Sequence, residues 1–167
     1  GLYAAELEAC NQRANLTAIS GHDAVQIKHF LDSLTCLLAF PEGSGQRVID
    51  VGSGAGFPGL PLKIVRPDVR LTLLESVGKK VAFLRHVIAR LDLSDVQVLC
   101  GRAEDMAQIS DHRERYDVVV ARAVAELRVL AEYTLPFCRQ GGVVIAQKNE
   151  GIDAEIESAA RAISTLG

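Results

Sequence analysis

The sequence is poor in several residue types. It has no tryptophan, one methionine and 5% aromatic residues, and no apolar run in it reaches the length of a membrane span. Its cysteines lie far apart and form no C-x-x-C pair, which argues against a zinc ribbon or a disulfide scaffold. We therefore expect reduced thiols in or near the core of a cytoplasmic protein, with no metal site and no membrane partner. The cysteines are Cys10, Cys36, Cys100 and Cys138.

An excess of charge of either sign is also missing. The net charge is −3 over 167 residues, so overall charge neither indicates nor excludes binding to a nucleic acid. With 49% hydrophobic residues, a chain of this length can bury a core without disulfides or metal. We expect a single monomeric domain over residues 1–167, with an N-terminal helical segment over 1–40 and an α/β core over 46–167.

The N-terminal segment has the periodicity of two helices. The first is predicted over residues 1–13 and is broken at Asn15. Ser20 and Asp23 are placed as a capping pair for the second helix. Apolar residues in that helix recur at steps of four, three and four, which predicts a stripe facing the core. The stripe residues are Ile27, Leu31, Leu34 and Leu38.

From residue 46 onward, short apolar runs alternate with helical patterns. The runs are continuous, which predicts strands covered on both faces and therefore a parallel sheet with right-handed crossovers. Gly141-Gly142 predicts a turn before the last strand. In such sheets ligands bind beyond the carboxyl ends of the strands, where the strand order reverses. The predicted strands are 48–51, 71–75, 96–99, 116–121 and 143–146, and the predicted helices run from the glycine loop to residue 66, over 79–91 and over 124–138, where Pro136 should end or kink the last one.

The segment VIDVGSGAGFPG, residues 48–59, joins a buried strand to a glycine loop. Such a junction lets backbone N–H groups approach a ligand closely, so it predicts a nucleotide-like cofactor. Read from Gly54, it fits the dinucleotide pattern G-x-G-x-x-G. Read from Asp50, it places a carboxylate at the strand end, which can meet the ammonium group of S-adenosylmethionine and would repel a pyrophosphate. This second pattern favours S-adenosylmethionine over NAD, and a tight turn without a ligand is the simplest alternative. The glycines of the pattern read from Asp50 are Gly52, Gly54 and Gly56.

Other predicted strands also end in residues suited to a cofactor. Glu75 follows Gly52 by 23 residues, a spacing at which an acid can accept hydrogen bonds from ribose hydroxyls. Ala103 and Glu104 follow the third strand, where a small residue and a carboxylate suit an adenine ring and its amine. Arg122 ends the fourth strand between two alanines, and we expect it to point into the cleft.

Several stretches of the chain resemble the RsmG (GidB) family: NLTAI, HFLDSL, VIDVGSGAGFPGLPLKIVRPD, LTLLESVGKKVAFL, GRAED and DVVVARAVAEL. The resemblance implies a class I S-adenosylmethionine-dependent methyltransferase fold with an N-terminal helical extension. It implies methylation of N7 of a guanine in 16S ribosomal RNA, either naked or in the small-subunit particle. That fold continues with two more strands, so we expect a C-terminal strand pair to be missing here. The resemblance places the cofactor site on Gly52, Phe57, Glu75, Ala103, Glu104 and Arg122.

The expected reaction needs no general base, because the N7 lone pair of guanine carries no proton. The resemblance makes Asn15, His29 and Asp32 catalytic candidates, although Asn15 suits a turn and the other two suit a surface beside the core stripe. A methyltransferase acting on a small molecule or a protein, and an NAD-dependent oxidoreductase, are the alternatives. Cationic residues near the cleft that could hold RNA phosphates are Lys28, Arg122 and Lys148.

Overall fold

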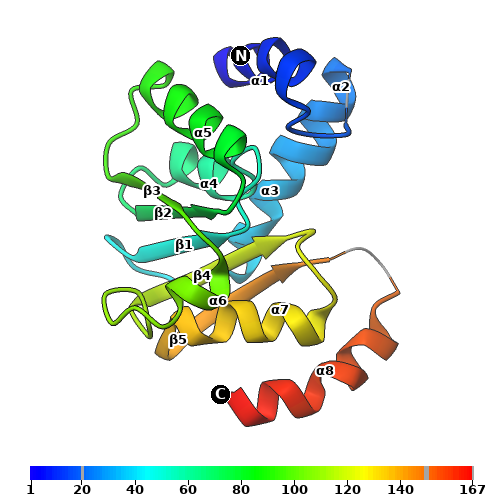
Figure 1. Ribbon diagram of the computed structural model, residues 1–167, viewed down its shortest axis with the longest axis vertical. Helices are drawn as coiled ribbons and strands as arrows, with labels where there is room; N and C mark the ends of the chain where they lie inside the picture. The colour runs from blue at the N-terminus through cyan, green and yellow to red at the C-terminus, as the bar shows by residue number, and fades with distance from the viewer. Residues whose placement is uncertain (20, 149–150, 167) are drawn as a thin grey trace.

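The computed structural model describes the backbone of residues 1–19, 21–148 and 151–166, and within it a five-stranded parallel sheet has the order β3-β2-β1-β4-β5 (Figure 1). The strands are β1 (Arg47–Val51), β2 (Arg70–Glu75), β3 (Val96–Cys100), β4 (Tyr116–Arg122) and β5 (Cys138–Gln147). The α-helices are α1 (Leu2–Ala14), α2 (His22–Val25), α3 (Asp32–Leu34), α4 (Gly59–Val65), α5 (Gly78–Arg90), α6 (Ala103–Met106), α7 (Leu127–Thr134) and α8 (Asp153–Leu166). The predicted α/β class and parallel sheet are confirmed.

The strand order reverses beside β1. From β1 the chain moves outward to β2 and β3, and then crosses back to β4 on the other side of β1. The carboxyl ends of β1 and β4 therefore flank the point where ligands bind in open α/β sheets. In Figure 1 the N-terminal helices α2 and α3 run past the sheet at the ends of the strand arrows.

Alternate residues of the central strands belong to two separate cores, one on each face of the sheet. In β4, Val118 and Val120 join the core beneath α1, α4 and α5, whereas Val119 and Ala121 join the core beneath α6 and α7. All four side chains are fully buried. A strand buried on both faces has no polar alternation, which is why continuous apolar runs located these strands in the sequence.

The last strand begins five residues earlier than predicted. Gly141 and Gly142 lie inside β5, so the predicted turn is wrong. Pairing between β4 and β5 shifts register between Tyr116 and Val118, as at a β-bulge. A Cβ atom at Gly142 would lie 2.9 Å from the carbonyl oxygen of Asp117, and Gly141 has a φ of +73°. The glycine pair therefore permits the irregular pairing between β4 and β5, and it does not form the predicted turn.

The predicted core stripe of the second helix is also wrong. Ile27 and Leu31 are each 59% exposed, and Leu38 is 91% exposed. The segment continues from α2 through a π-helix over Gln26–Leu31, then α3 and a 3₁₀ helix over Thr35–Ala39. Its buried residues are His29, Ser33 and Cys36.

A buried polar face is possible here because its hydrogen bonds are made within the chain. Ser33 Oγ donates to the carbonyl oxygen of His29, and the His29 ring is bonded on both nitrogens. The N-cap of this helical segment also differs from the prediction. Gly21 is the N-cap of α2, and no side chain among the described residues caps that helix. Ser20, the predicted cap, lies outside the described residues.

Three further predictions are settled by local structure. Helix α4 ends at Val65 with Arg66 as its C-cap, one residue before the end that the following proline predicted. Helix α7 is shorter than expected, and Pro136 lies in the 3₁₀ turn that follows it, Leu135–Phe137. Cys36 is buried, but Cys100 is exposed, so the expectation of four core or near-core thiols is wrong for Cys100.

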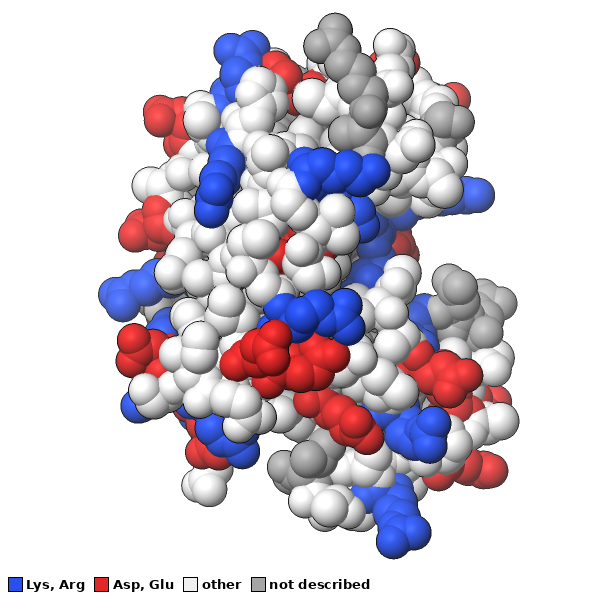
Figure 2. Space-filling model, in the orientation of Figure 1, with Lys and Arg blue, Asp and Glu red and all other residues white. Residues whose placement is uncertain are grey.

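The surface carries charges of both signs in close proximity. On the face shown in Figure 2, cationic and anionic side chains are interspersed over most of the surface, and a group of anionic side chains lies together below the centre of the view. This distribution agrees with a net charge near zero. Any recognition of a polyanion on this face must therefore use local groups of residues.

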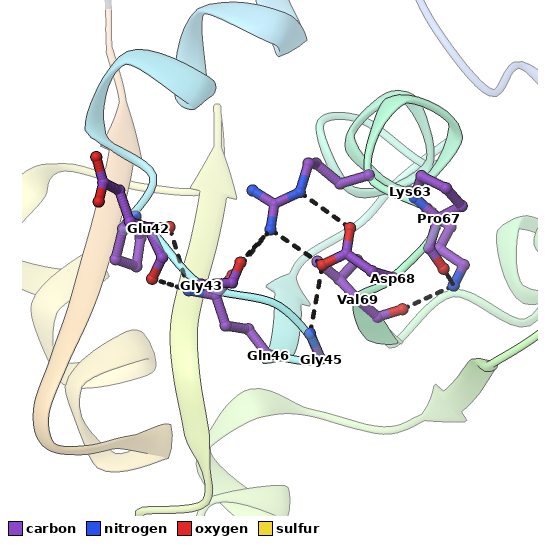
Figure 3. Close-up of polar contacts among 10 residues, drawn as sticks. Glu42, Gly43, Gly45, Gln46, Lys63, Pro67, Asp68 and Val69 are labelled. Atoms are coloured by element: carbon purple, nitrogen blue, oxygen red, sulfur yellow. Dashed lines mark hydrogen bonds and ion pairs between the residues drawn. The ribbon is translucent and has the colours of Figure 1, made fainter.

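The amino ends of the strands are held by a network of completed hydrogen bonds, shown in Figure 3. Arg66 donates to both carboxylate oxygens of Asp68 at 3.0 Å and to the carbonyl oxygen of Gly43 at 2.6 Å. Lys63, only 2% exposed, donates from Nζ to the carbonyl oxygens of Pro67 and Val69 at 2.8 and 2.7 Å. These contacts join the loop before β1 to the loop before β2.

Candidate active site

Asp50 lies beneath the glycine loop. Its side chain has no exposed surface, and its Oδ2 accepts a hydrogen bond from the backbone N–H of Gly59 at 2.9 Å. Its Oδ1 is buried and has no hydrogen-bond partner among the described residues. Burial raises the pKa of Asp50 to about 7, against the opposing effects of the Gly59 hydrogen bond and the charge of Arg122. The carboxylate faces the loop backbone, so in this structure it holds the loop and the helix that follows.

Glu75 organises the same loop from the end of β2. One carboxylate oxygen accepts the N–H of Gly54 at 2.9 Å, and the other accepts the N–H of Val77 at 2.8 Å. The side chain is buried, with the residue 5% exposed. A carboxylate has about four acceptor positions, so these two bonds leave capacity for further donors such as hydroxyl groups. The predicted ribose role of Glu75 stays a prediction.

The glycines of the loop have different surroundings. A Cβ atom at Gly52 would lie 2.7 Å from Val124, and one at Gly56 would lie 2.5 Å from Leu60. At Gly59 it would lie 2.7 Å from Asp50 Oδ2. At Gly54 the nearest atom would be 3.9 Å away, although its φ is +59°. Gly54 therefore borders open space, whereas the others allow close packing within the protein.

A cavity of about 220 Å³ opens beside this loop. It is lined by Gly52 at the end of β1 and by Ala103 and Glu104 at the start of α6, three of the predicted cofactor residues. Hydrogen bonding from its own backbone N–H, followed by Arg102, lowers the pKa of Glu104. The remaining lining residues are Val51, Leu74, Ser76, Gly101, Arg102, Val124, Ala125 and Tyr133.

The residues that the sequence reasoning missed differ in how they could have been found. Val124 and Ala125 follow the predicted strand end at Arg122, so their position was available from the strand boundary. Tyr133 lies on α7, and its contribution to the cavity depends on how that helix packs against the sheet. No sequence signal marks that side chain as a site residue.

Arg122 connects the sheet to the N-terminal segment. Its guanidinium donates to Asp32 Oδ2 at 2.9 Å, to the Lys28 carbonyl oxygen at 3.1 Å, and lies 2.9 Å from His29 Nδ1. It also lies over the Phe57 ring, 5.3 Å from the centroid. Its side chain is 14% exposed. Arg122 thus joins β4, the glycine loop and the N-terminal helices.

His29 is part of this cluster and is not the surface residue that we considered. Its ring stacks on Phe57 with centroids 4.5 Å apart, and its Nε2 lies 2.8 Å from Thr17 Oγ1. Burial, and then the charge of Arg122, lower the pKa of His29 to about 4. Arg122 can only donate, so Nδ1 accepts and Nε2 carries the proton. A neutral ring with both nitrogens occupied positions its neighbours and does not act as a base.

A second hollow, of about 600 Å³, lies beyond the carboxyl ends of β4 and β5. The predicted site residues Lys28, Asp32, Arg122 and Lys148 line it. Lys148 already pairs with Glu155 at 2.6 Å and donates to the Ala125 carbonyl oxygen. The lining also includes Ile19, Ile27, His29, Ala123 and Gln147.

Asn15 lines neither of these two spaces. It is the C-cap of α1 with left-handed backbone angles, φ 46° and ψ 59°, which agrees with the turn interpretation. It lines a separate hollow of about 360 Å³ between α1 and α2. Across the described ranges, no group of three or more His, Cys, Asp or Glu residues could hold a metal ion. None of the described helices combines the length and apolar character needed to cross a membrane.

Comparison with known proteins identifies the family. The profile of the rRNA small subunit methyltransferase G (GidB) family matches residues 1–167. The chain belongs to this family. It is 57% identical over 165 residues to ribosomal RNA small subunit methyltransferase G of Roseiflexus sp. strain RS-1, covering 99% of this chain and 70% of that protein. The protein of the same name from Pelotomaculum thermopropionicum is 54% identical over 157 residues, covering 94% and 66%.

Solved structures share the fold at low sequence identity. A SAM-dependent methyltransferase from Aquifex aeolicus aligns with a TM-score of 0.60 and 18% identity over 86% of this chain and 82% of that chain. Haemonchus contortus phosphoethanolamine N-methyltransferase 2, in complex with S-adenosyl-L-methionine, aligns with a TM-score of 0.63 and 15% identity over 83% and 36%. The methyltransferase fold that the family resemblance implied is confirmed, and family membership argues against the NAD-dependent oxidoreductase.

Proposed function

We propose that this protein transfers a methyl group from S-adenosylmethionine to N7 of a guanine in 16S ribosomal RNA. Membership of the rRNA small subunit methyltransferase G family over the whole chain is the observation that carries this proposal. We assign the activity to one methyltransferase domain over residues 1–167. The substrate is the ribosomal RNA or the small-subunit particle that contains it.

The chemistry of the glycine loop and of the cavity beside it suits S-adenosylmethionine. Gly54 borders open space where a Cβ atom would intrude, and the cavity wall beside the loop is small and apolar at Ala103 and Val124. No phosphate-binding cation is needed, since this cofactor carries no phosphate. We propose that the backbone of Gly52 and Gly54 holds its amino-acid part, with Gly56 and the buried Phe57 supporting the loop. We also propose that Glu75 holds the ribose hydroxyls and that Ala103 with Glu104 borders the adenine.

Asp50 and Arg122 act on this cofactor site through the loop. Asp50 fixes the loop through the Gly59 N–H, and Arg122 lies over Phe57. Both residues lie at the carboxyl end of the sheet and contact the glycine loop or the start of α4, so we retain them as cofactor-site residues in a supporting role. When bound, the cofactor supplies an electrophilic methyl group on a sulfonium centre.

The protein contributes orientation to the reaction. Guanine N7 has an in-plane lone pair and loses no proton, so a His29 ring that is neutral and bonded on both nitrogens is compatible with the reaction. Holding two reactants in line can supply roughly 7–11 kcal/mol of the barrier in favourable systems. Positive charge moves to the base during transfer, and the Asp32 carboxylate at the second hollow is placed to stabilise it.

The test is transfer of tritiated methyl groups from S-adenosylmethionine to 16S ribosomal RNA and to small-subunit particles. N7-methylguanine is cleaved after reduction and aniline treatment, so strand scission maps the modified position. We expect one position and a rate that falls with rising salt, because phosphate contacts release counterions. Cofactor binding with methylation of only a small molecule or a protein would overturn the RNA proposal and leave the fold intact.

A further inference from the structure

The second hollow adjoins the cofactor cavity through a single turn of the chain. Arg122 and Ala123 line the hollow, and the next two residues, Val124 and Ala125, line the cavity. The two spaces therefore lie on either side of the turn that follows β4. A methyl transfer needs its two reactants in adjoining spaces, and this hollow, of about 600 Å³, is in the size range of small-molecule sites.

The walls of the hollow differ in chemistry. Ile19 and Ile27 provide apolar surface, and Ile27 is 59% exposed. Asp32 supplies a hydrogen-bond acceptor on another wall, where Gln147 lies beside it. Asp32 Oδ2 accepts from Arg122, while Oδ1 has no hydrogen bond in the part of the chain that the structure describes. Gln147 donates its amide N–H to the Asp32 carbonyl oxygen and to Thr35, and its Oε1 is buried without a partner among the described residues.

We propose that this hollow takes the target guanine, with Asp32 reading its Watson–Crick edge; the proposal rests on the function proposed above. Guanine presents two adjacent donors on that edge, N1–H and the N2 amino group, which match a carboxylate. Adenine presents an acceptor at N1, so the same carboxylate rejects it. The apolar side chain of Ile27 packs against the ring of a base turned out of its strand.

This placement leaves the reacting atom available. N7 lies on a different edge of guanine from N1 and N2, so Asp32 can hold the base while N7 faces the cofactor cavity. The methylated base is cationic, and a carboxylate on its far edge stabilises that charge. Arg122 keeps Asp32 in place through the 2.9 Å ion pair, which makes Asp32 the reading residue and Arg122 a positioning residue.

Inosine tests this directly, because it keeps N1–H, O6 and N7 but lacks the N2 amino group. Once strand scission has located the target guanine, 16S ribosomal RNA with inosine at that position is compared with the natural RNA. We expect kcat/KM to fall about 10- to 100-fold on inosine with the parent protein, the range for a lost hydrogen bond to a charged group. In Asp32→Asn we expect slower guanine methylation and a guanine-to-inosine ratio near one.

The outcomes separate this inference from the proposed function. Equal rates on guanine and inosine in the parent protein would overturn the base-reading role and leave RNA methylation standing. An unchanged ratio in a folded Asp32→Asn protein would also overturn it. A parent protein that binds S-adenosylmethionine and methylates no RNA would overturn both.

A second pair of variants avoids the ion pair with Arg122. Ile27→Glu places a charge at the apolar wall, and we expect kcat/KM for RNA to fall about tenfold or more with cofactor affinity unchanged. Leu38→Glu is the control, because Leu38 is 91% exposed on the same helical segment and outside the lining of the hollow. Equal losses in the two variants would show that the hollow is not the base site.

Discussion

Two aspartates at opposite ends of the sheet have pKa values that are shifted in opposite directions. Asp68, at the amino end, receives hydrogen bonds from Arg66 that lower its pKa to about 2. Asp50, at the carboxyl end, is buried with a single backbone donor to its carboxylate, and burial raises its pKa to about 7. The carboxylate of Asp68 thus has hydrogen-bond donors for both oxygens, whereas that of Asp50 has a donor for only one among the described residues.

Other residues follow the same division. Lys63, at the amino end, is buried with two carbonyl partners. The buried side-chain oxygens without a partner in the described residues, on Asp50 and Gln147, both lie toward the carboxyl end. A buried unpaired acceptor costs roughly 1–3 kcal/mol, so its presence needs a reason. We infer that the amino end maintains the fold and the carboxyl end is shaped for ligands.

The largest expected effect tests this division through pH. Folded Asp50 keeps its proton up to about pH 7 while the unfolded residue, with an ordinary pKa of 3.8, loses it, so native protein binds more protons between these values. Stability therefore falls as pH rises through this window. Asp50→Asn removes the free-energy cost of ionising this buried carboxyl group above pH 7, which is on the order of 4 kcal/mol at most. Urea unfolding of parent and variant at pH 5 and pH 8 measures it.

Asp68→Asn serves as the control with the opposite sign. Because the folded pKa of Asp68 is lowered, its stabilisation is present above the ordinary pKa and is lost as pH falls through about 2. Its variant should therefore show no difference in pH dependence between pH 5 and pH 8. Parallel unfolding curves for the parent and Asp50→Asn across that range would contradict the raised pKa.

Two glycines with similar backbone angles allow the carboxyl and amino ends of the sheet to be compared. Gly54 has a φ of +59° and Gly45 a φ of +68°, and a Cβ atom at either has no protein atom within 3.8 Å. Gly54→Val and Gly45→Val should lose similar stability, since both force a branched residue into the left-handed region. Only Gly54→Val should lose S-adenosylmethionine affinity, by about 100-fold or more. Calorimetric titration that finds equal affinities would remove Gly54 from the cofactor site.

The sequence predicted the sheet well because its signals are local. Continuous apolar runs located all five strands, and Pro67 located the end of α4 to within one residue, since the helix ends at Val65 with Arg66 as its C-cap. The glycine loop predicted a methyltransferase cofactor from its own residue order. These features depend on backbone sterics and on burial of both faces, which act at short range in the chain.

The errors arose where tertiary contacts decide. Helical periodicity assigned Ile27 and Leu31 to the core, but stacking of His29 on Phe57 and its bond to Arg122 turn the other face inward. Gly141-Gly142 carried a turn signal that long-range pairing with β4 overrides. Tyr133 reaches the cofactor cavity only through helix packing. None of these contacts has a signature in the local sequence.

Arg122 is an exception to the division between a fold-maintaining amino end and a ligand-binding carboxyl end. It lies at the carboxyl end, yet it makes several hydrogen bonds within the chain. We expect Arg122→Ala to cost about 1–3 kcal/mol of stability, since Asp32, His29 and the Lys28 carbonyl lose a largely buried donor. The charge of Arg122 lowers the pKa of His29, so this pKa should rise from about 4 in the variant. Urea unfolding and NMR titration of the His29 ring measure the two effects.

An unchanged His29 pKa together with parental stability would contradict this role for Arg122. Arg139→Ala is the matched control at the amino end. Arg139 pairs with Asp117 at 2.6 Å, and its side chain is 49% exposed. This variant should leave the His29 titration unchanged.

The smallest expected effect concerns Arg66, the centre of the amino-end network. Its side chain and that of Asp68 are 27% and 34% exposed, so solvent screens the pair. Arg66→Ala should lower the melting temperature by only about 2–4 °C, and less at high salt. Affinity for S-adenosylmethionine should be unchanged, because the network joins loops at the end of the sheet away from the glycine loop. A tenfold loss of affinity in this variant would show that the two ends are coupled through the strands and that the division between them fails.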